Sequence, residues 1–163
     1  MSNKRRKQAA GFTIAEMLLA LAISAMLLVA VAVAFNASII NYTKNEAIFK
    51  SVNNARQALV RMTSQMRTGD NFNTLDPNNR CSFFTAQNDD ITYEYRSGEH
   101  KIFLITNSDG QAYELCDNVA SMNFVKTATA DGSDIKSIQI SIKVGTGDNI
   151  RSVASGVLVR KNL

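Results

Sequence analysis

The sequence predicts an α+β protein in which one long N-terminal helix packs on an antiparallel β-sheet. No glycine or proline stands between Gly11 and Gly69, and these are the residues that usually interrupt helices. After Gly69 the chain changes to short apolar segments separated by turns rich in Gly, Asn and Asp, a pattern typical of hairpins. A helix and a sheet that each bury one apolar face form a two-layer α+β domain.

The first part of the predicted helix is apolar enough to lie in a membrane. Residues 17–35 contain one polar side chain, Ser24, and a helix of about 20 residues crosses a bilayer core. Four basic residues stand upstream: Lys4, Arg5, Arg6 and Lys7. By the positive-inside rule we expect this cluster in the cytoplasm and the rest of the protein, from about residue 42, on the other side.

The second part of the predicted helix is amphipathic. Its apolar residues are spaced four, three, four, three and four apart, which places them on one helix face. They are Ile48, Val52, Ala55, Leu59, Met62 and Met66. We therefore expect one helix from about residue 12 to about residue 67, with its second part facing a core.

A polar loop with turn residues, 69–80, ends this helix. Strands are then expected at residues 91–95, 101–106, 111–116, 119–127, 135–144 and 150–160. The clearest is 135–144, where Ile138, Ile140, Ile142 and Val144 alternate with polar residues. Such alternation is the pattern of a half-buried antiparallel strand.

The charge and the supply of reactive residues exclude several functions. The net charge of +4 comes from the N-terminal cluster: removing those four from 18 basic residues leaves 14, which equals the 14 acidic residues. The folded part then lacks a basic face for nucleic acid. His100 is the only histidine, and 107–110 and 131–134 are incomplete fragments of calcium loops. We predict no catalytic site, no metal and no cofactor.

Cys81 and Cys116 are the only cysteines. Two cysteines in a chain that carries an export signal predict one disulfide, which would close a loop of about 35 residues. The alternative is two separate buried thiols, because free cysteine packs as a small apolar residue.

The N-terminus permits three interpretations. It could be an uncleaved signal anchor, or a secretory signal peptide cut after Ala32-Val33-Ala34, although the apolar run is longer than the usual ~7–15 residues. The third interpretation begins from Gly11-Phe12-Thr13-Ile14-Ala15-Glu16, which resembles the prepilin signature of type IV pilin-like proteins. We favour this interpretation because glycine, phenylalanine and glutamate recur at the family's spacing beside a membrane-length run.

The resemblance implies a role for each matching residue. Lys4, Arg5, Arg6 and Lys7 correspond to the basic leader. Prepilin peptidase would cut between Gly11 and Phe12 and N-methylate Phe12. Glu16 matches the family glutamate that directs assembly, with the free amine of Phe12 on the same or a neighbouring subunit as its partner. We expect Thr13, beside it, to belong to the same assembly site.

A local role for Glu16 is compatible with that assembly role. Thr13 and Glu16 have the spacing of a capping box, in which the two residues cap the first turn of a helix reciprocally. A carboxylate there also suits the positive end of the helix dipole. Neither effect explains an acidic residue within an apolar stretch, where charge is costly and is a functional hypothesis by default.

The resemblance also implies an organisation and a function. We expect a cleaved leader at 1–11, a transmembrane assembly half of the helix at 12–40, an amphipathic half at 41–68 and a sheet body at 69–163. The chain would be a pilin-like subunit of the bacterial inner membrane, single-pass with a cytoplasmic N-terminus, whose partners are prepilin peptidase and other pilin-like subunits in a fibre.

The subtype that the sequence resembles is a minor subunit. There is no tryptophan and no proline after Pro77, and the chain ends in an apolar strand followed by "VRKN". These features are similar to J-type minor pseudopilins of type II secretion, which implies a place at or near the fibre tip. The alternative from another class is a secreted or anchored binding module that uses its sheet, with the N-terminus serving export alone.

Overall fold

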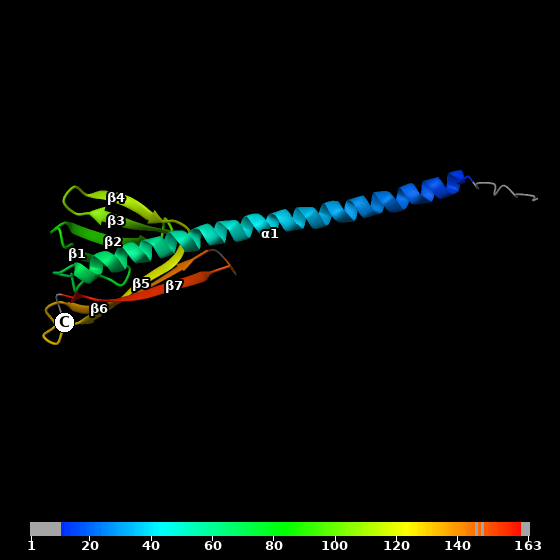
Figure 1. Ribbon diagram of the computed structural model, residues 1–163. Coiled ribbons are helices and arrows are strands. Elements are labelled where there is room, and N and C mark those ends of the chain that lie inside the picture. The colour runs from blue at the N-terminus through cyan, green and yellow to red at the C-terminus, as the bar shows by residue number, and fades with distance from the viewer. Residues whose placement is uncertain (1–10, 146, 148, 161–163) are drawn as a thin grey trace, which may run out of the picture. The chain divides into compact units, whose positions relative to one another are not determined.

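The computed structural model describes residues 11–145, 147 and 149–160. In this part of the chain one helix, α1 (Ile14–Thr68), precedes seven strands (Figure 1). The strands are β1 (Arg80–Phe84), β2 (Asp90–Arg96), β3 (Lys101–Thr106), β4 (Gln111–Cys116), β5 (Val119–Ala128), β6 (Ile135–Val144) and β7 (Arg151–Leu158). The predicted α+β fold of one long helix with antiparallel strands is confirmed. The chain forms two units, Met1–Lys44 and Asn45–Leu163, and α1 contributes to both.

The strands form two antiparallel sheets rather than the single sheet that the sequence predicted. The first has the order β1-β2-β3-β4 and the second the order β5-β6-β7. Neighbours in each sheet are also neighbours in sequence, so each sheet is a meander of hairpins. Six of these strands were predicted from the sequence, and β1 was not.

The second half of α1 supplies the helical side of the core. The predicted stripe is buried at Ala55, Leu59, Met62 and Met66, and Val52 packs at its border. These side chains share one cluster with Tyr93 of the first sheet and with the isoleucines of β6. Burying apolar side chains of this size contributes about 1.5–3 kcal/mol each, which makes this shared core the main stabilising term of the body.

Two polar side chains, those of Ser51 and Asn118, lie where the buried part of α1 begins. Ser51 is buried on the α1 stripe, where its hydroxyl donates to the Ala47 carbonyl at 3.1 Å. The Asn118 amide, from the short link between the sheets, donates to the Ser51 hydroxyl at 3.3 Å. The linker is thereby tied to the helix by a hydrogen bond as well as by packing.

The predicted loop 69–80 has a structural role of its own. It runs beside the outer edge of β1, where Asp70 and Phe84 exchange two backbone hydrogen bonds of 3.0 Å. Its far end connects the two sheets, because the Asn78 carbonyl accepts from Phe124 N on β5 at 2.7 Å and the Asn79 carbonyl accepts from Tyr95 N on β2 at 2.9 Å.

Candidate functional site

Gly11, Phe12 and Thr13, the described residues that precede α1, are exposed. Gly11 and Phe12 have no regular secondary structure, and Phe12 is 83% exposed. No atom lies within 4 Å of the position that a Cβ at Gly11 would occupy. The bond between Gly11 and Phe12 is therefore open to an enzyme within the described part of the chain.

Thr13 and Glu16 form the capping box that their spacing predicted. The Glu16 carboxylate accepts from the Thr13 backbone N–H at 2.9 Å and from the Thr13 hydroxyl at 3.0 Å, both through Oε2. In return the Glu16 backbone N–H donates to Thr13 Oγ1 at 3.2 Å. The first helical bond, from Met17 N to the Thr13 carbonyl at 3.1 Å, closes the turn. Two of the unpaired donors at the helix start are thus satisfied reciprocally.

This arrangement lies wholly on the C-terminal side of the Gly11–Phe12 bond. Cutting that bond would remove none of the three capping hydrogen bonds and would leave the new amine one residue before Thr13. Glu16 Oε1 accepts none of the three bonds. The carboxylate can therefore cap the helix and still face a cation.

The apolar half of α1 is uncovered within its own chain. None of residues 11–47 is buried, and the exposed fraction within α1 is 81% at Ile14 and 73% at Met26. The helix is long and apolar enough to cross a membrane, and its most apolar window has no buried residue. An apolar surface of this extent marks a membrane or protein interaction site.

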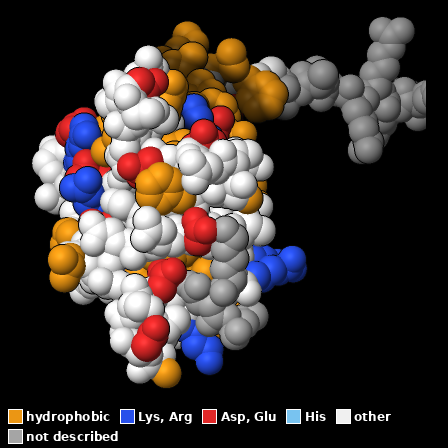
Figure 2. Space-filling view, turned by 90° about the vertical axis from the view of Figure 1, so that its left-hand side faces the viewer, with side chains coloured by type: hydrophobic (Ala, Val, Ile, Leu, Met, Phe, Trp, Pro, Cys, Tyr) orange, Lys and Arg blue, Asp and Glu red, His pale blue; other side chains and the backbone are white. Residues whose placement is uncertain are grey.

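The surface of the body is different in character. On the face shown in Figure 2, apolar side chains occur mostly singly among acidic, basic and uncharged ones. Scattered apolar residues of this kind are normal for a surface in water. The contrast with the N-terminal half of α1 agrees with a helix that lies in lipid and a body that lies in water.

The structure also places the other residues that the sequence singled out. Lys4, Arg5, Arg6 and Lys7 of the predicted leader lie outside the described residues. His100 is exposed in the β2–β3 turn, and its Nδ1 lies 3.3 Å from the Val119 carbonyl oxygen. Among the residues described, no three His, Cys, Asp or Glu side chains gather closely enough to hold a metal. In the 131–134 turn, hydrogen bonds from Thr129 and Ser133 lower the pKa of Asp131 to about 2.

Cys81 and Cys116 are buried and free, so the expected disulfide is not formed in the structure. The reason is the strand order: Cys81 lies on β1 and Cys116 on β4, with β2 and β3 between them. Three inter-strand spacings amount to about 14 Å, whereas a disulfide requires Cα atoms within about 7 Å. The alternative of two separate buried thiols describes the structure.

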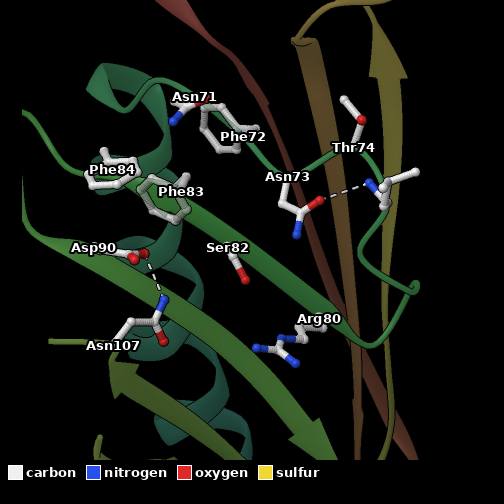
Figure 3. A pocket seen from close by; sticks show the side chains of 11 residues that line it. Asn71, Phe72, Asn73, Thr74, Arg80, Ser82, Phe83, Phe84, Asp90 and Asn107 are labelled. Atoms are coloured by element: carbon white, nitrogen blue, oxygen red, sulfur yellow. Dashed lines mark hydrogen bonds between the residues drawn. The ribbon is translucent and has the colours of Figure 1, made fainter. Parts of the chain in front are cut away.

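A pocket that the sequence did not reveal lies between the 69–79 loop and the face of the first sheet turned away from α1 (Figure 3). Its volume is about 490 Å³. Asn107 donates to Asp90 at 2.7 Å, and the Ser82 and Thr92 hydroxyls share a hydrogen bond of 2.8 Å. Arg80 Nε is buried there without a hydrogen-bond partner among the described residues, although it lies 4.0 Å from Asp76 Oδ1 in an ion pair. Because most of the polar groups bond one another, we assign the pocket no ligand.

Comparison with known families matches one segment of the chain. The family model of the prokaryotic N-terminal methylation motif covers residues 6–32. Neither the curated proteins nor the solved structures gave a match. The motif supports the type IV pilin-like prepilin signature and indicates a substrate of prepilin peptidase. Pilin-like proteins with this motif are structural fibre subunits rather than enzymes, and the apolar helix near the N-terminus fits anchoring in the inner membrane.

Proposed function

We propose that this chain is a minor pilin-like subunit, a pseudopilin, of a type II secretion or type IV pilus-type fibre. Prepilin peptidase cuts between Gly11 and Phe12 on the cytoplasmic side and methylates the Phe12 amine. The mature chain is stored in the inner membrane with its body outside the cytoplasm. It then enters the fibre through the N-terminal half of α1.

One observation carries this proposal. An accessible Gly11–Phe12 bond stands directly before a capped helix whose first half has no buried residue. A secretory signal peptide cut after Ala34 would separate the two halves of a helix that is continuous from Ile14 to Thr68. Retaining the whole helix requires a cut before Thr13.

Glu16 is the residue to which we assign assembly. Its carboxylate lies in the first turn of an apolar helix, where an unpaired charge is unfavourable in lipid. Pairing with the Phe12 amine of a neighbouring subunit would neutralise both charges. The energy of that pairing favours transfer of the helix from lipid into a bundle of helices.

The minor-subunit role rests on resemblance. The chain lacks tryptophan, and its C-terminal strand is followed by Arg160 and two further polar residues, as in J-type pseudopilins. A place at or near the fibre tip follows from that subtype. The rival function, a binding module exported by its N-terminus, would require only the body.

The mature N-terminus tests this proposal. We would purify the chain from membranes of its own host and determine both the N-terminal sequence and the intact mass. A chain that begins at Phe12 and is heavier by one methyl group is the expected result. A chain beginning at Phe35 or at Met1 would overturn the proposal, in favour of a secreted protein or a signal anchor respectively.

A body that performs its function with residues 1–34 replaced by a conventional signal peptide would favour the binding module. The same replacement in a fibre subunit removes the assembly helix and abolishes incorporation. Comparing the two forms therefore separates the two functions.

A further inference from the structure

The outer edge of β7 is open. Val159 N donates to the carbonyl of Lys136, the residue before Ser137 of β6, at 3.0 Å. In an antiparallel pair every second residue bonds the neighbouring strand, so the residues of β7 that bond β6 are 151, 153, 155 and 157. The N–H and carbonyl groups of Ser152, Ala154, Gly156 and Leu158 consequently point away from the sheet. Within the described part of the chain, no hydrogen bond to these groups is found.

β7 also lacks the features that protect sheet edges from pairing with other chains. Its register with β6 is continuous over eight residue pairs, without a bulge. Between Arg151 and Arg160 it has no proline and no charged residue. Natural proteins normally block an edge of this kind with a charge, a proline, a bulge or a covering segment.

The 69–79 loop contacts two of the other three edges, that of β1 along its length and that of β5 at one residue. The 69–79 loop runs along β1, and its residue Asn78 bonds Phe124 on the outer edge of β5. β4 is the remaining open edge. Its register with β3 shifts between Ile102 and Phe103, but at Ala112 and Glu114 the backbone groups point outward without a partner in the described residues.

The two open edges carry complementary charges at their ends. β4 is flanked by the exposed carboxylates Asp109 and Asp117. β7 begins at the exposed Arg151 and is followed by the exposed Arg160. Neither arginine has an ion pair within the described residues. Complementary charges of this kind select a partner and fix its register more than they add affinity.

β4 and β7 run in opposite directions relative to the end of α1. The start of β4 lies near that end of α1. Asn107 N, between β3 and β4, bonds the Asp90 carbonyl at the same end of the first sheet where Asp70 pairs with Phe84. The end of β7 also lies there, because Phe72 N bonds Asp134, which precedes β6. Two bodies with the same orientation would therefore bring β7 and β4 together as antiparallel strands.

We propose that the β7 edge of one copy pairs with the β4 edge of a second copy, which joins the three-stranded sheet of one body to the four-stranded sheet of the next. An antiparallel register that sets Asp117 opposite Arg151 places Asp109 opposite Val159, next to Arg160. It also sets Glu114 opposite Ala154 and Ala112 opposite Gly156, and all four of these residues have outward backbone groups. The contact is head-to-tail, because the two edges that meet are different ones.

This pairing rests on the body alone and does not require Glu16 to direct assembly. It can be tested in the full chain in membranes, where two tagged forms are produced together. One form carries Ala112→Cys and the other Gly156→Cys. Gly156 has ordinary backbone geometry, and its added Cβ would lie 3.9 Å from the Ile138 carbonyl oxygen, so the substitution fits.

A short thiol-specific cross-linker should join the two forms into a mixed dimer that carries both tags. The native cysteines provide a silent background, because both thiols are buried. The matched control replaces Gly156→Cys by Ser121→Cys, an exposed position on β5, and should give no mixed dimer. A mixed dimer no more abundant than in this control would overturn the proposal. Dimers formed equally by Gly156→Cys alone would also overturn it, in favour of pairing between two β7 strands.

A charge exchange tests the register without altering the fold. Arg151→Glu in the Gly156→Cys form should abolish the mixed dimer, because it faces Asp117 with a like charge. Adding Asp117→Lys to the other form should restore the dimer. Retention of cross-linking in the Arg151→Glu variant, or failure of the second exchange to restore it, would contradict the pairing.

Discussion

Thr13 and Glu16 hold each other at the start of α1 by three hydrogen bonds, and Glu16 Oε2 accepts two of them. The motif glutamate is therefore engaged in a helix cap before any subunit contact is made. Capping does not use Oε1. A local structural role and an assembly role can consequently coexist on one carboxylate, and they can be separated by substitution.

Glu16→Gln should retain the cap and lose assembly. Glutamine serves in a capping box as well as glutamate does, but it has no charge to pair with the Phe12 amine. We expect normal cleavage after Gly11 and a loss of the chain from the fibre fraction sheared from cells. Glu16→Ala should behave in the same way. Wild-type incorporation of the glutamine variant would contradict the assembly role.

Thr13→Ala is the matched control. It removes the hydroxyl that caps Glu16 N but leaves the carboxylate and its bond from the Thr13 N–H. Loss of a helix cap of this type costs about 0.5–2 kcal/mol. Because the membrane environment also stabilises the helix, the variant should still be cut and assembled. If it failed as completely as Glu16→Gln, capping rather than charge would be the function of the pair.

Met62→Ala should destabilise the body strongly. Met62 is 0% exposed and lies on the buried α1 stripe, in one cluster with core residues of both sheets. Removing a buried methionine side chain costs about 2–5 kcal/mol. Urea unfolding of the detergent-solubilised chain, followed by tyrosine circular dichroism, measures the change. Val60→Ala, on the exposed face of the same helix at 68% exposure, should change the stability by less than about 0.5 kcal/mol.

Asp76→Ala should loosen the loop that covers β1. The Asp76 side chain is only 6% exposed. Its Oδ2 accepts from Ser82 N at 2.6 Å and its Oδ1 from Asn73 Nδ2 at 3.1 Å. Leaving the Ser82 N–H without its partner costs about 1–3 kcal/mol. The same urea experiment measures this loss, and limited proteolysis should show earlier cutting between residues 69 and 80.

Asp117→Ala is the control for Asp76→Ala. Asp117 is exposed, and no hydrogen bond to its side chain is present among the described residues. Its removal should leave both stability and proteolysis unchanged. An equal effect of the two variants would mean that net charge, rather than the contacts of Asp76, holds the loop.

The sequence predicted α1 and six strands well because their patterns are long and regular. In β6, for example, Ile138, Ile140 and Ile142 alternate with polar residues, and all three are buried. β1 was missed because it has five residues and directly follows a polar loop. Its burial alternates through Cys81 and Phe83, but a pattern of two buried positions is too short to distinguish from a turn.

The division into two sheets could not be predicted because it depends on contacts distant in sequence. Asn78 and Asn79 of a loop with ordinary turn composition bond β5 and β2 respectively. The polar side of β2 shows the same limit. Thr92 is a polar residue that alternates with the apolar Ile91 and Tyr93, yet it is 0% exposed and hydrogen-bonds with Ser82 and Asn107.

The two cysteines, which the strand order keeps apart as buried thiols, should make the free energy of unfolding depend on pH. Burial raises the pKa of Cys81 and the pKa of Cys116 from about 9 to about 12. Above about pH 9 the unfolded chain therefore loses thiol protons that the folded chain keeps. The free energy of unfolding should fall as the pH rises from about 9 towards 12, because stability decreases wherever the unfolded state binds fewer protons.

Urea unfolding at several pH values, with and without Cys81→Ala and Cys116→Ala together, measures this contribution. The double variant should show a shallower decline between pH 9 and 10. A decline should remain above about pH 10, because burial also raises the pKa of Tyr93 from 10.0 to about 12. An equally steep decline in the double variant would exclude the thiols as its cause. An intact mass lighter by the hydrogens of a disulfide would show instead that the strands rearrange enough to join them.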